Sequence, residues 1–533
     1  MHSLPVPMLS ILVFFPLLAA VMFAFMPEDR KLLNTFSGVT SGALFVLSVI
    51  FWLSSTRAGI YPIETHAWLS ELGISYSMGV DNLSWVLVLL TTFLVFMAVI
   101  ASFTTIDKRL RLYYSMLFTL TGAILGVFLA RDLFLFFLFW ELELIPMYLL
   151  IAIWGGPRRE YAAIKFVLYT LFGSVFMLAA ILGLFFYTKA MLGFSTFDFT
   201  HLSLAHTFGL PVTAQVLMFL GFFIAFAIKL PMVPFHTWLP DAHVEAPTPV
   251  SMLLAGILLK MGAYGMLRFC FGWFPEAATI LAPYLVLFGV INILYTAGVA
   301  LAQSDLKKLI AYSSVSHMGF VLLGLGALNA IGFNGAVFQM ISHGLISAGL
   351  FMIVGTIYTR THTREIAEMG GFGKVMPTVF CFALLISLAS LGLPLLAGFP
   401  AETLVFYGAF LSKAFHSIPW FGGGSLPFTI QSLTMCAAVG VILGAAYLLW
   451  MLARVFNGPI FPKWETLTDA VPSEVFVLGC LSLFIIGFGI FPNWVAWQFE
   501  SDVSAMAKPY EVTQQAARPA PIKMIATLTG GQH

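Results

Sequence analysis

The sequence predicts an all-α polytopic membrane protein with about 14 transmembrane helices. Of its 533 residues, 60% are hydrophobic and only 9% are charged, whereas average soluble chains carry about 25% charged residues. Apolar runs of the length that crosses a bilayer, about 20 residues, recur along most of the chain. The net charge of +1 does not suggest a nucleic-acid partner.

Fourteen apolar runs are the predicted spans. The first lacks a preceding basic segment and a small-residue cleavage site, so it predicts a membrane helix and not a cleaved signal peptide. The twelfth is too long for one simple span and contains Pro394 and Pro400, which predict a break. The predicted spans cover residues 6–26, 33–54, 84–103, 112–130, 132–153, 162–187, 214–235, 248–269, 277–300, 307–327, 331–357, 377–411, 430–453 and 473–495.

Basic residues in the alternate loops predict the orientation. The loops after odd-numbered spans carry fourteen Lys and Arg, while the intervening loops carry five. The positive-inside rule then places the first set on the cytoplasmic side and both termini on the opposite side. The polar tail from about 501 to 533 is expected to be loosely ordered. The first set comprises Arg30, Lys31, Lys108, Arg109, Arg111, Arg158, Arg159, Lys307, Lys308, Arg360, Arg364, Lys374, Arg454 and Lys463; the second comprises Arg57, Arg131, Lys189, Arg268 and Lys413.

The stretch 219–260 places two lysines, Lys229 and Lys260, in the middle of different predicted spans. A lysine near the bilayer centre costs about 2.5–3.5 kcal/mol even on the lenient scale, so it normally faces protein or water. Unlike arginine, a buried lysine can release its proton. Both are candidate proton carriers, with a snorkelling lysine as the alternative. Lys165 lies near the start of its span, where snorkelling to the surface is equally consistent with its position.

Between the two lysines, a segment rich in proline interrupts the seventh span. Broken membrane helices occur where they border protein or a water-filled cavity. His236 and His243 fall in this segment, where they could admit protons or cap the broken helix. The proline interruptions of spans seven and twelve predict a transporter built from inverted repeats.

Two glutamates in the fifth span are further candidates. Glu141 lies about nine residues into the span, and a buried glutamate beside a lysine can hold or pass a proton according to its neighbours. The alternative is a carboxylate that only packs helices together. Glu143 is two residues further on, about 200° around a regular helix. It is therefore expected to face a different partner or an edge.

His317, His343 and Glu402 complete the set of candidates. An imidazole titrates near neutral pH and suits a proton relay, but a buried neutral histidine bonded to a carbonyl is the structural alternative for both. Polar residues near His343, such as Gln339 and Ser347, favour hydration there. Glu402 follows the break in the twelfth span, a position typical of a carrier.

No resident cofactor is expected. The four cysteines form no CxxC pair, whereas zinc and iron–sulfur sites need clustered thiolates. The sequence also lacks a GxGxxG or Walker motif for a nucleotide. We expect the cysteines to be small buried hydrophobic residues. They are Cys270, Cys381, Cys436 and Cys480.

The segments FWELELIPMYLL, AAIKFVLYT, AFAIKLPMVPFHTWLPDAHVEAPTPVSMLLAGILLKMGAYG, LKKLIAYSSVSHMGF and QMISHGLISAGLF resemble one family. It is the antiporter-like chain 4, or M-type, subunit of complex I, and the resemblance covers roughly residues 80–500. It implies two inverted five-helix repeats, helices 4–8 and 9–13, and hence the division 1–111, 112–269, 270–456 and 457–533. It also implies that Glu141 pairs with Lys229. The implied proton relay is Glu141, Lys229, Lys260, His317, His343 and Glu402.

The resemblance implies a proton-translocating subunit of an NAD(P)H– or ferredoxin–quinone oxidoreductase, driven by quinone reduction in other subunits. Quinone, iron–sulfur clusters and the electron donor would then belong to those subunits. The implied partners are other membrane subunits, including antiporter-like ones, and lipids. WELEL and AYSSVSHMGF look most like the cyanobacterial and plastid chains, which implies a thylakoid membrane, or otherwise a bacterial inner membrane.

One departure and two alternatives remain open. The family usually reads Leu-Pro-Gly with Ser-Gly-Phe-Val before the glutamate of helix 12, whereas this chain reads LPLLAGFPAE. The extra Pro400 changes the expected break, and it could mark the paralogue of the carbon dioxide-uptake form. A stand-alone sodium/proton antiporter subunit is disfavoured by Glu402, where such subunits usually carry lysine. A scaffold without pumping is disfavoured by the cost of inserting the buried lysines.

Overall fold

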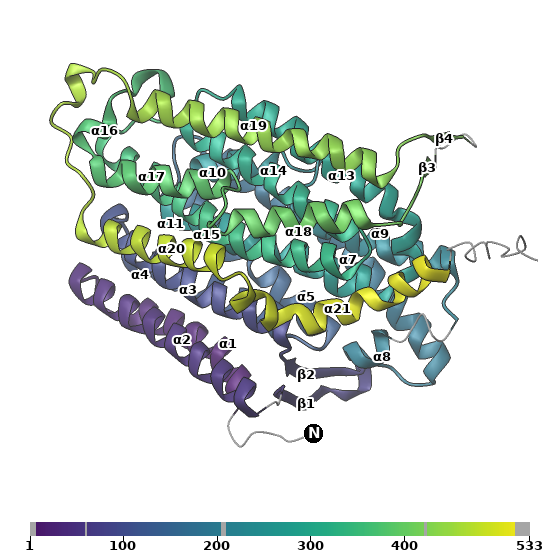
Figure 1. Ribbon diagram of the computed structural model, residues 1–533. Helices are drawn as coiled ribbons and strands as arrows, with labels where there is room; N and C mark the ends of the chain where they lie inside the picture. Colours follow the sequence, from purple (N-terminus) through teal and green to yellow (C-terminus); the bar gives the residue numbers. More distant parts are fainter. Residues whose placement is uncertain (1–6, 59–60, 204–208, 420–423, 517–533) are drawn as a thin grey trace, which may run out of the picture.

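The computed structural model describes residues 7–58, 61–203, 209–419 and 424–516, and it is a bundle of long membrane helices (Figure 1). Among the described helices, thirteen are long and apolar enough to cross a membrane. A fourteenth span consists of two shorter helices, α17 (Pro377–Ser390) and α18 (Gly398–Leu411). The predicted fold class, including the break in the twelfth span, is therefore confirmed.

Each span is formed by one or more helices. Spans 1–7 are α1 (Met8–Phe25), α2 (Arg30–Ala58), α3 (Asn82–Thr105), α4 (Leu110–Leu129), α5 (Leu133–Leu142) with α6 (Leu144–Trp154), α7 (Arg159–Leu192) and α9 (Val212–Lys229). Span 8 joins α11 (Thr248–Leu253), the π-helical η2 (Leu254–Leu258), α12 (Leu259–Gly265) and the π-helical η3 (Met266–Phe271). Spans 9–11, 13 and 14 are α13 (Pro275–Leu301), α14 (Leu306–Gly326), α15 (Ala330–Thr361), α19 (Ile430–Phe456) and α20 (Pro472–Ile490).

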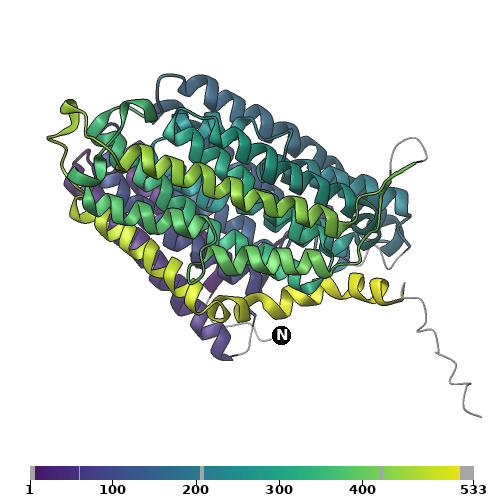
Figure 2. The same cartoon turned by 45° about the horizontal axis from the view of Figure 1, so that its top comes forward.

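The strands lie at the end of the bundle, and α10 lies inside it, in the break of span 7 (Figures 1 and 2). One end, the hairpin face, carries the antiparallel strands β1 (Ile63–Leu69) and β2 (Ile74–Gly79), which η1 (Ser70–Leu72) connects. The other end, the basic-loop face, carries the loops that hold the larger set of basic residues. The remaining elements are α8 (Phe199–Ser203), α10 (Trp238–Glu245), η4 (Ile366–Glu368), α16 (Phe372–Val375), β3 (Ile418–Pro419), β4 (Ser425–Leu426), η5 (Pro462–Trp464) and α21 (Asn493–Ala516).

Each helix of spans 4–8 runs in the opposite direction to its counterpart in spans 9–13. Span 4 starts at the basic-loop face and span 9 starts at the hairpin face, so corresponding helices of the two sets are antiparallel. In both sets the broken helix is the fourth member. The chain therefore has the arrangement expected of two inverted five-helix repeats.

The break in span 7 follows Lys229, the last residue of α9. Pro231 and Pro234 lack an N–H group and cannot continue the helix. The free backbone groups are bonded from other helices, since Asn292 Oδ1 of α13 accepts from the Val233 N–H at 2.7 Å and Trp238 Nε1 donates to the Ile228 carbonyl at 2.9 Å. A broken helix is tolerated within a membrane when its free backbone groups are bonded to protein in this way.

The break in span 12 spans 391–397, where Gly392 adopts a φ of 70°. A side chain at Gly392 would meet Glu402 Oε2 at 2.7 Å, so this glycine leaves room for the carboxylate. Pro400 is the third residue of α18, where no N–H has an intrahelical partner in any helix, so it costs no helical hydrogen bond. The break beside Pro400 is therefore compatible with an intact α18.

The expectation of a loosely ordered tail from 501 is wrong for its first part, because α21 continues to Ala516. The apolar side chains Val495, Phe499, Val503, Ala507 and Tyr510 recur at helical spacing and are buried against the bundle. The polar composition of the segment predicted disorder because polar residues separate the members of this apolar stripe. Residues 517–533 of the predicted tail lie outside the described residues.

Candidate functional site

Lys229 at the end of α9 forms an ion pair with Glu143, not with Glu141 as the family resemblance implied. Both partners are almost completely buried. The ammonium also lies over the ring of Trp140, 5.3 Å from its centroid. Glu141 Oε1 is buried without a hydrogen-bond partner in the described structure. Glu141 lies within electrostatic range of Lys229, while the ion pair of the lysine in the described structure is with Glu143.

Span 5 has an irregularity beside the glutamate that pairs with Lys229. Glu143 is a turn residue between α5 and α6. Pro146 follows three residues later and cannot donate to the carbonyl of Leu142, which interrupts the helical hydrogen bonds. Glu143 itself keeps right-handed helical backbone angles, and its side chain meets Lys229 of span 7.

Lys260 lies in α12, between the two π-helical segments of span 8, and is fully buried. Its Nζ donates to the Ala255 carbonyl at 2.6 Å and lies 2.7 Å from His343 Nδ1 on α15. The structure thus joins the central lysine directly to one of the two predicted histidines. π-Helical segments shift the side chains that follow them around the axis and are frequent at functional sites.

His317, on α14, continues the row beyond His343. The two imidazole centroids are 5.6 Å apart. His317 Nε2 lies 3.1 Å from Ser390 Oγ, and His317 Nδ1 lies 3.6 Å from Glu402 Oε1. Lys260, His343, His317 and Glu402 are therefore neighbours in that order, from the first repeat to the break in span 12.

A small cavity lies along this row, with a volume of about 10 Å³, which is roughly the room that one water molecule needs. A polar site of this kind suits bound water, which needs two to four polar partners. Water between such groups would let a proton pass without large movements of the side chains. Its polar lining consists of His317, Gln339, Ser342, His343, Ser390 and Glu402.

The remaining candidates lie closer to the basic-loop face. Lys165 Nζ donates to Asp241 Oδ2 of α10 at 2.7 Å, so it is held by an ion pair and does not snorkel freely. His236 lies near the rings of Tyr295 and Tyr312. His243 is fully buried, stacks on Phe351 and has no hydrogen-bond partner on either ring nitrogen within the described structure.

Two buried cations were treated as loop charges in the sequence. Lys307 donates its Nζ hydrogen bond to the Ala246 carbonyl, where α10 ends, and is buried. Arg268 is buried inside η3 and forms an ion pair with Asp81. Its position could have been found from the spacing Lys260, Tyr264, Arg268, since residues four apart share a helix face.

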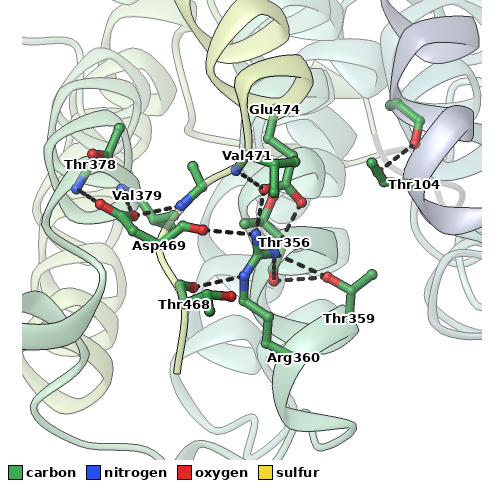
Figure 3. A network of polar contacts seen from close by, with 12 residues as sticks. Thr104, Thr356, Thr359, Arg360, Thr378, Val379, Thr468, Asp469, Val471 and Glu474 are labelled. Atoms are coloured by element: carbon green, nitrogen blue, oxygen red, sulfur yellow. Dashed lines mark hydrogen bonds and ion pairs between the residues drawn. The ribbon is translucent and has the colours of Figure 1, made fainter. Parts of the chain in front are cut away.

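A polar network at the basic-loop face fixes the first half of span 12 (Figure 3). Arg360, in the last turn of α15, donates to both carboxylate oxygens of Glu474 at 3.0 and 2.7 Å. The adjacent Asp469 accepts from the amides of Thr378 and Val379 in the first turn of α17. Burial alone would raise the pKa of Asp469, but these bonds hold it below its ordinary value.

This network ties α15, which carries His343, to α17, which carries Ser390. A bidentate Arg–carboxylate pair fixes direction as well as distance. The helices that present the row of titratable groups are thus held in register at one end. Among the described residues, no three His, Cys, Asp or Glu side chains gather in a way that could hold a metal ion.

Two family models match the chain. Residues 130–425 match the membrane family of NADH:quinone oxidoreductases and Mrp antiporters. Residues 8–130 match the amino terminus of NADH–ubiquinone oxidoreductase chain 4.

Related proteins extend along nearly the whole chain. A NAD(P)H–quinone oxidoreductase chain 4 of Acaryochloris marina is 43% identical, with 94% of this chain and 92% of that protein covered. A second chain 4 of Synechococcus elongatus is 45% identical over 91% of this chain and 90% of that protein. Among solved structures, respiratory complex I from Thermus thermophilus contains a chain with 30% identity and a TM-score of 0.82, covering 94% of this chain and 99% of that one.

A chain of the Mrp complex from a Dietzia species shares the fold, with a TM-score of 0.80 at 20% identity and coverage of 96% and 99%. The fold and the buried row of titratable groups thus define an antiporter-like membrane subunit of the NADH:quinone oxidoreductase/Mrp family. Within that family, the chain belongs to the chain 4 subunits of NAD(P)H–quinone oxidoreductases.

Proposed function

We propose that this chain translocates protons across the membrane as chain 4 of a complex I-type oxidoreductase. Quinone reduction in other subunits would drive it through changes of charge along the buried row. The electron donor, NAD(P)H or ferredoxin, the iron–sulfur clusters and the quinone would bind to those subunits.

The observation that carries the proposal is the contact between Lys260 and His343 in the middle of the bundle. A buried lysine is expensive unless a neighbour shares its proton or charge. Here the ammonium lies 2.7 Å from an imidazole nitrogen, which is within reach of a direct proton transfer. His317 and Glu402 then lead from this pair to the break in span 12.

The Lys229 end supplies the second part of the proposal. Glu143 holds the lysine, and the charge of Glu141, within electrostatic range of it, would respond to the charge of the lysine. Whether Lys229 is charged would then depend on which carboxylate is ionised. Charge at Lys229 would in turn alter the proton affinity of the groups further along the row.

Replacement of the central lysine tests the proposal. Lys260→Ala should assemble into the complex but lose most proton translocation per electron transferred in sealed vesicles. Lys260→Arg should fail as well, because arginine keeps its proton at any workable pH. The matched control is Lys463→Ala, which removes a lysine whose side chain is 51% exposed and which pairs with Glu368 at the surface. Normal pumping by an assembled Lys260→Ala complex would contradict the proposal.

The proposal also includes the setting of the chain. We propose a cyanobacterial thylakoid membrane, with other antiporter-like subunits and lipids as neighbours and both termini on the lumenal side. The sequence similarity to cyanobacterial chains supports the proposal of a cyanobacterial membrane. The excess of basic residues in alternate loops supports the orientation. We also propose that the two repeats cover residues 112–269 and 270–456, between the segments 1–111 and 457–533.

The alternative function is a stand-alone sodium/proton antiporter subunit, which the shared fold of the Mrp complex brings into consideration. It predicts transport that depends on sodium and requires no electron transfer. Proton movement that requires quinone reduction and is unchanged when sodium is replaced by potassium would exclude it.

A further inference from the structure

The face of span 8 that carries Lys260 also carries Tyr264 and Arg268, one turn and two turns further towards the hairpin face. Arg268 is only 7% exposed. At about 1.5 Å per residue, it lies about 12 Å along the helix from Lys260. Arg268 lies three residues before Phe271, the last residue of η3. Arg268 therefore stands between the central lysine and the nearest end of its own helix.

Arg268 is held there by several contacts. Its Nη2 lies 2.6 Å from Asp81 Oδ2, and it also donates to Ser84 Oγ at 3.4 Å. Its guanidinium carbon lies 5.2 Å from the ring centroid of Tyr264. Asp81 in turn accepts from the amide of Ser84 at the start of α3. These contacts fix the cation across the gap between span 8 and span 3.

Other charges at this end face Asp81. Arg131 lies 4.0 Å from its carboxylate but is more exposed, and Asp502 of α21 lies within electrostatic range of it. Burial alone would raise the pKa of Asp81, but Arg268 and Arg131 hold it below its ordinary value. The pair therefore stays charged on both sides, and Arg268 keeps its proton throughout.

The polar hydroxyls on this face would otherwise offer a route outwards. Tyr264 Oη lies 3.4 Å from Ser84 Oγ and donates to the Phe128 carbonyl at 3.4 Å. A proton that left Lys260 in this direction would approach a fixed guanidinium. Because Asp81 lies beside the guanidinium, the two charges largely cancel at about 12 Å, and the repulsion is strong only for a proton that comes closer to the guanidinium than to the carboxylate. The repulsion grows as the proton comes closer.

We propose that Arg268, anchored by Asp81, is an electrostatic barrier that closes the shortest route from Lys260 to the hairpin face. Protons on Lys260 can then leave only towards His343, and so through the second repeat. A fixed arginine in a narrow polar passage excludes protons by the same physics in other membrane proteins. This inference rests on the proposed role of Lys260 but concerns leakage and not pumping.

The test is passive proton conductance, measured with an imposed pH gradient across sealed vesicles without electron donor. Vesicles with the Arg268→Gln complex should lose the gradient several-fold faster than vesicles with the wild type. The matched control is Arg131→Gln, which removes the more exposed guanidinium of the same carboxylate and should leave the gradient intact.

Since Arg268→Gln leaves Asp81 as an uncompensated buried charge, it could reduce assembly. The double variant Asp81→Asn/Arg268→Gln removes both charges, should assemble better and should still leak. Adding Lys260→Met to it should abolish the leak, because the route starts at that lysine. An assembled double variant that retains the gradient, or a leak that persists without Lys260, would overturn the barrier. Neither result depends on whether Lys260→Ala pumps.

Discussion

At the scale of single residues, the two glutamates of span 5 have different surroundings although they are two positions apart. Glu143 binds Lys229 with Oε1 while its Oε2 has no hydrogen-bond partner among the described residues, and Glu141 Oε1 likewise has none. We infer that Glu143 mainly holds the lysine in place and Glu141 mainly exchanges protons with it. The two roles can be separated by neutralising each carboxylate.

Glu143→Gln should reduce assembly of the complex strongly, because loss of one partner leaves Lys229 as a buried unpaired charge at a cost of about 3–5 kcal/mol. Glu141→Gln should assemble almost normally but lower the number of protons moved per electron. The double variant Glu143→Gln/Lys229→Met should recover assembly and not pumping. Native gels and proton uptake measure the two effects, and equal assembly of the two single variants would contradict the division of roles.

At the scale of elements, close contact between span 7 and span 8 places their lysines on neighbouring helices. Gly262 lies two residues after Lys260, and a side chain there would meet the Phe226 carbonyl at 2.7 Å and the Leu230 amide at 2.8 Å. Both are backbone atoms beside the break, which cannot move aside cheaply. The absence of a side chain at Gly262 therefore lets α12 lie against the end of α9.

Gly262→Ala should destabilise the protein by about 1–3 kcal/mol, the usual cost of overpacking. The matched control is Gly298→Ala in α13, where a new side chain meets nothing within 4 Å. There the better helix propensity of alanine should stabilise by up to about 1 kcal/mol. Thermal unfolding in detergent compares the two, and a Gly262→Ala protein as stable as the wild type would show that the contact is not tight.

The helices themselves could be predicted from the sequence, and the partners within the site could not. Span boundaries follow from the length of apolar runs, and both breaks follow from their prolines. The pairing of Lys229 with Glu143 is a contact between two helices, and neither helix by itself determines it. Arg268 lay near the end of a predicted span, so its burial depended on how far η3 extends. The strands β1 and β2 were not predicted because most of β1 is exposed and shows no alternation.

At the scale of the whole molecule, α21 joins parts that are far apart in the sequence. Asp502 accepts from the Asn82 amide at the start of α3, and Glu511 accepts from the Ala330 amide at the start of α15. Acidic groups at helix N-termini satisfy free amides and complement the helix dipole. The hairpin ends of span 3 and span 11 are thus bound by one terminal helix (Figure 2).

Orientation in the membrane is the property of the whole molecule that remains to be measured. The fourteen basic residues of the first set against five of the second predict that the basic-loop face is cytoplasmic. Reporter tags fused at Met1 and His533 should therefore both read non-cytoplasmic, while a tag in the 457–471 loop should read cytoplasmic. A cytoplasmic signal from either terminus would reverse or break the fourteen-span topology.

The hydrogen bonds at the break in span 7 determine how fast its amide hydrogens exchange with solvent. Irregular segments usually exchange their amide hydrogens quickly, because their N–H groups are free or bonded to solvent. The Val233 amide is instead bonded to the buried side chain of Asn292, and the adjacent Pro231 and Pro234 have no amide hydrogen. In deuterated buffer the break should therefore retain hydrogen at Val233 about as long as the surrounding helices do. Proton transfer from Lys229 would then occur beside a fixed backbone and not beside a hinge.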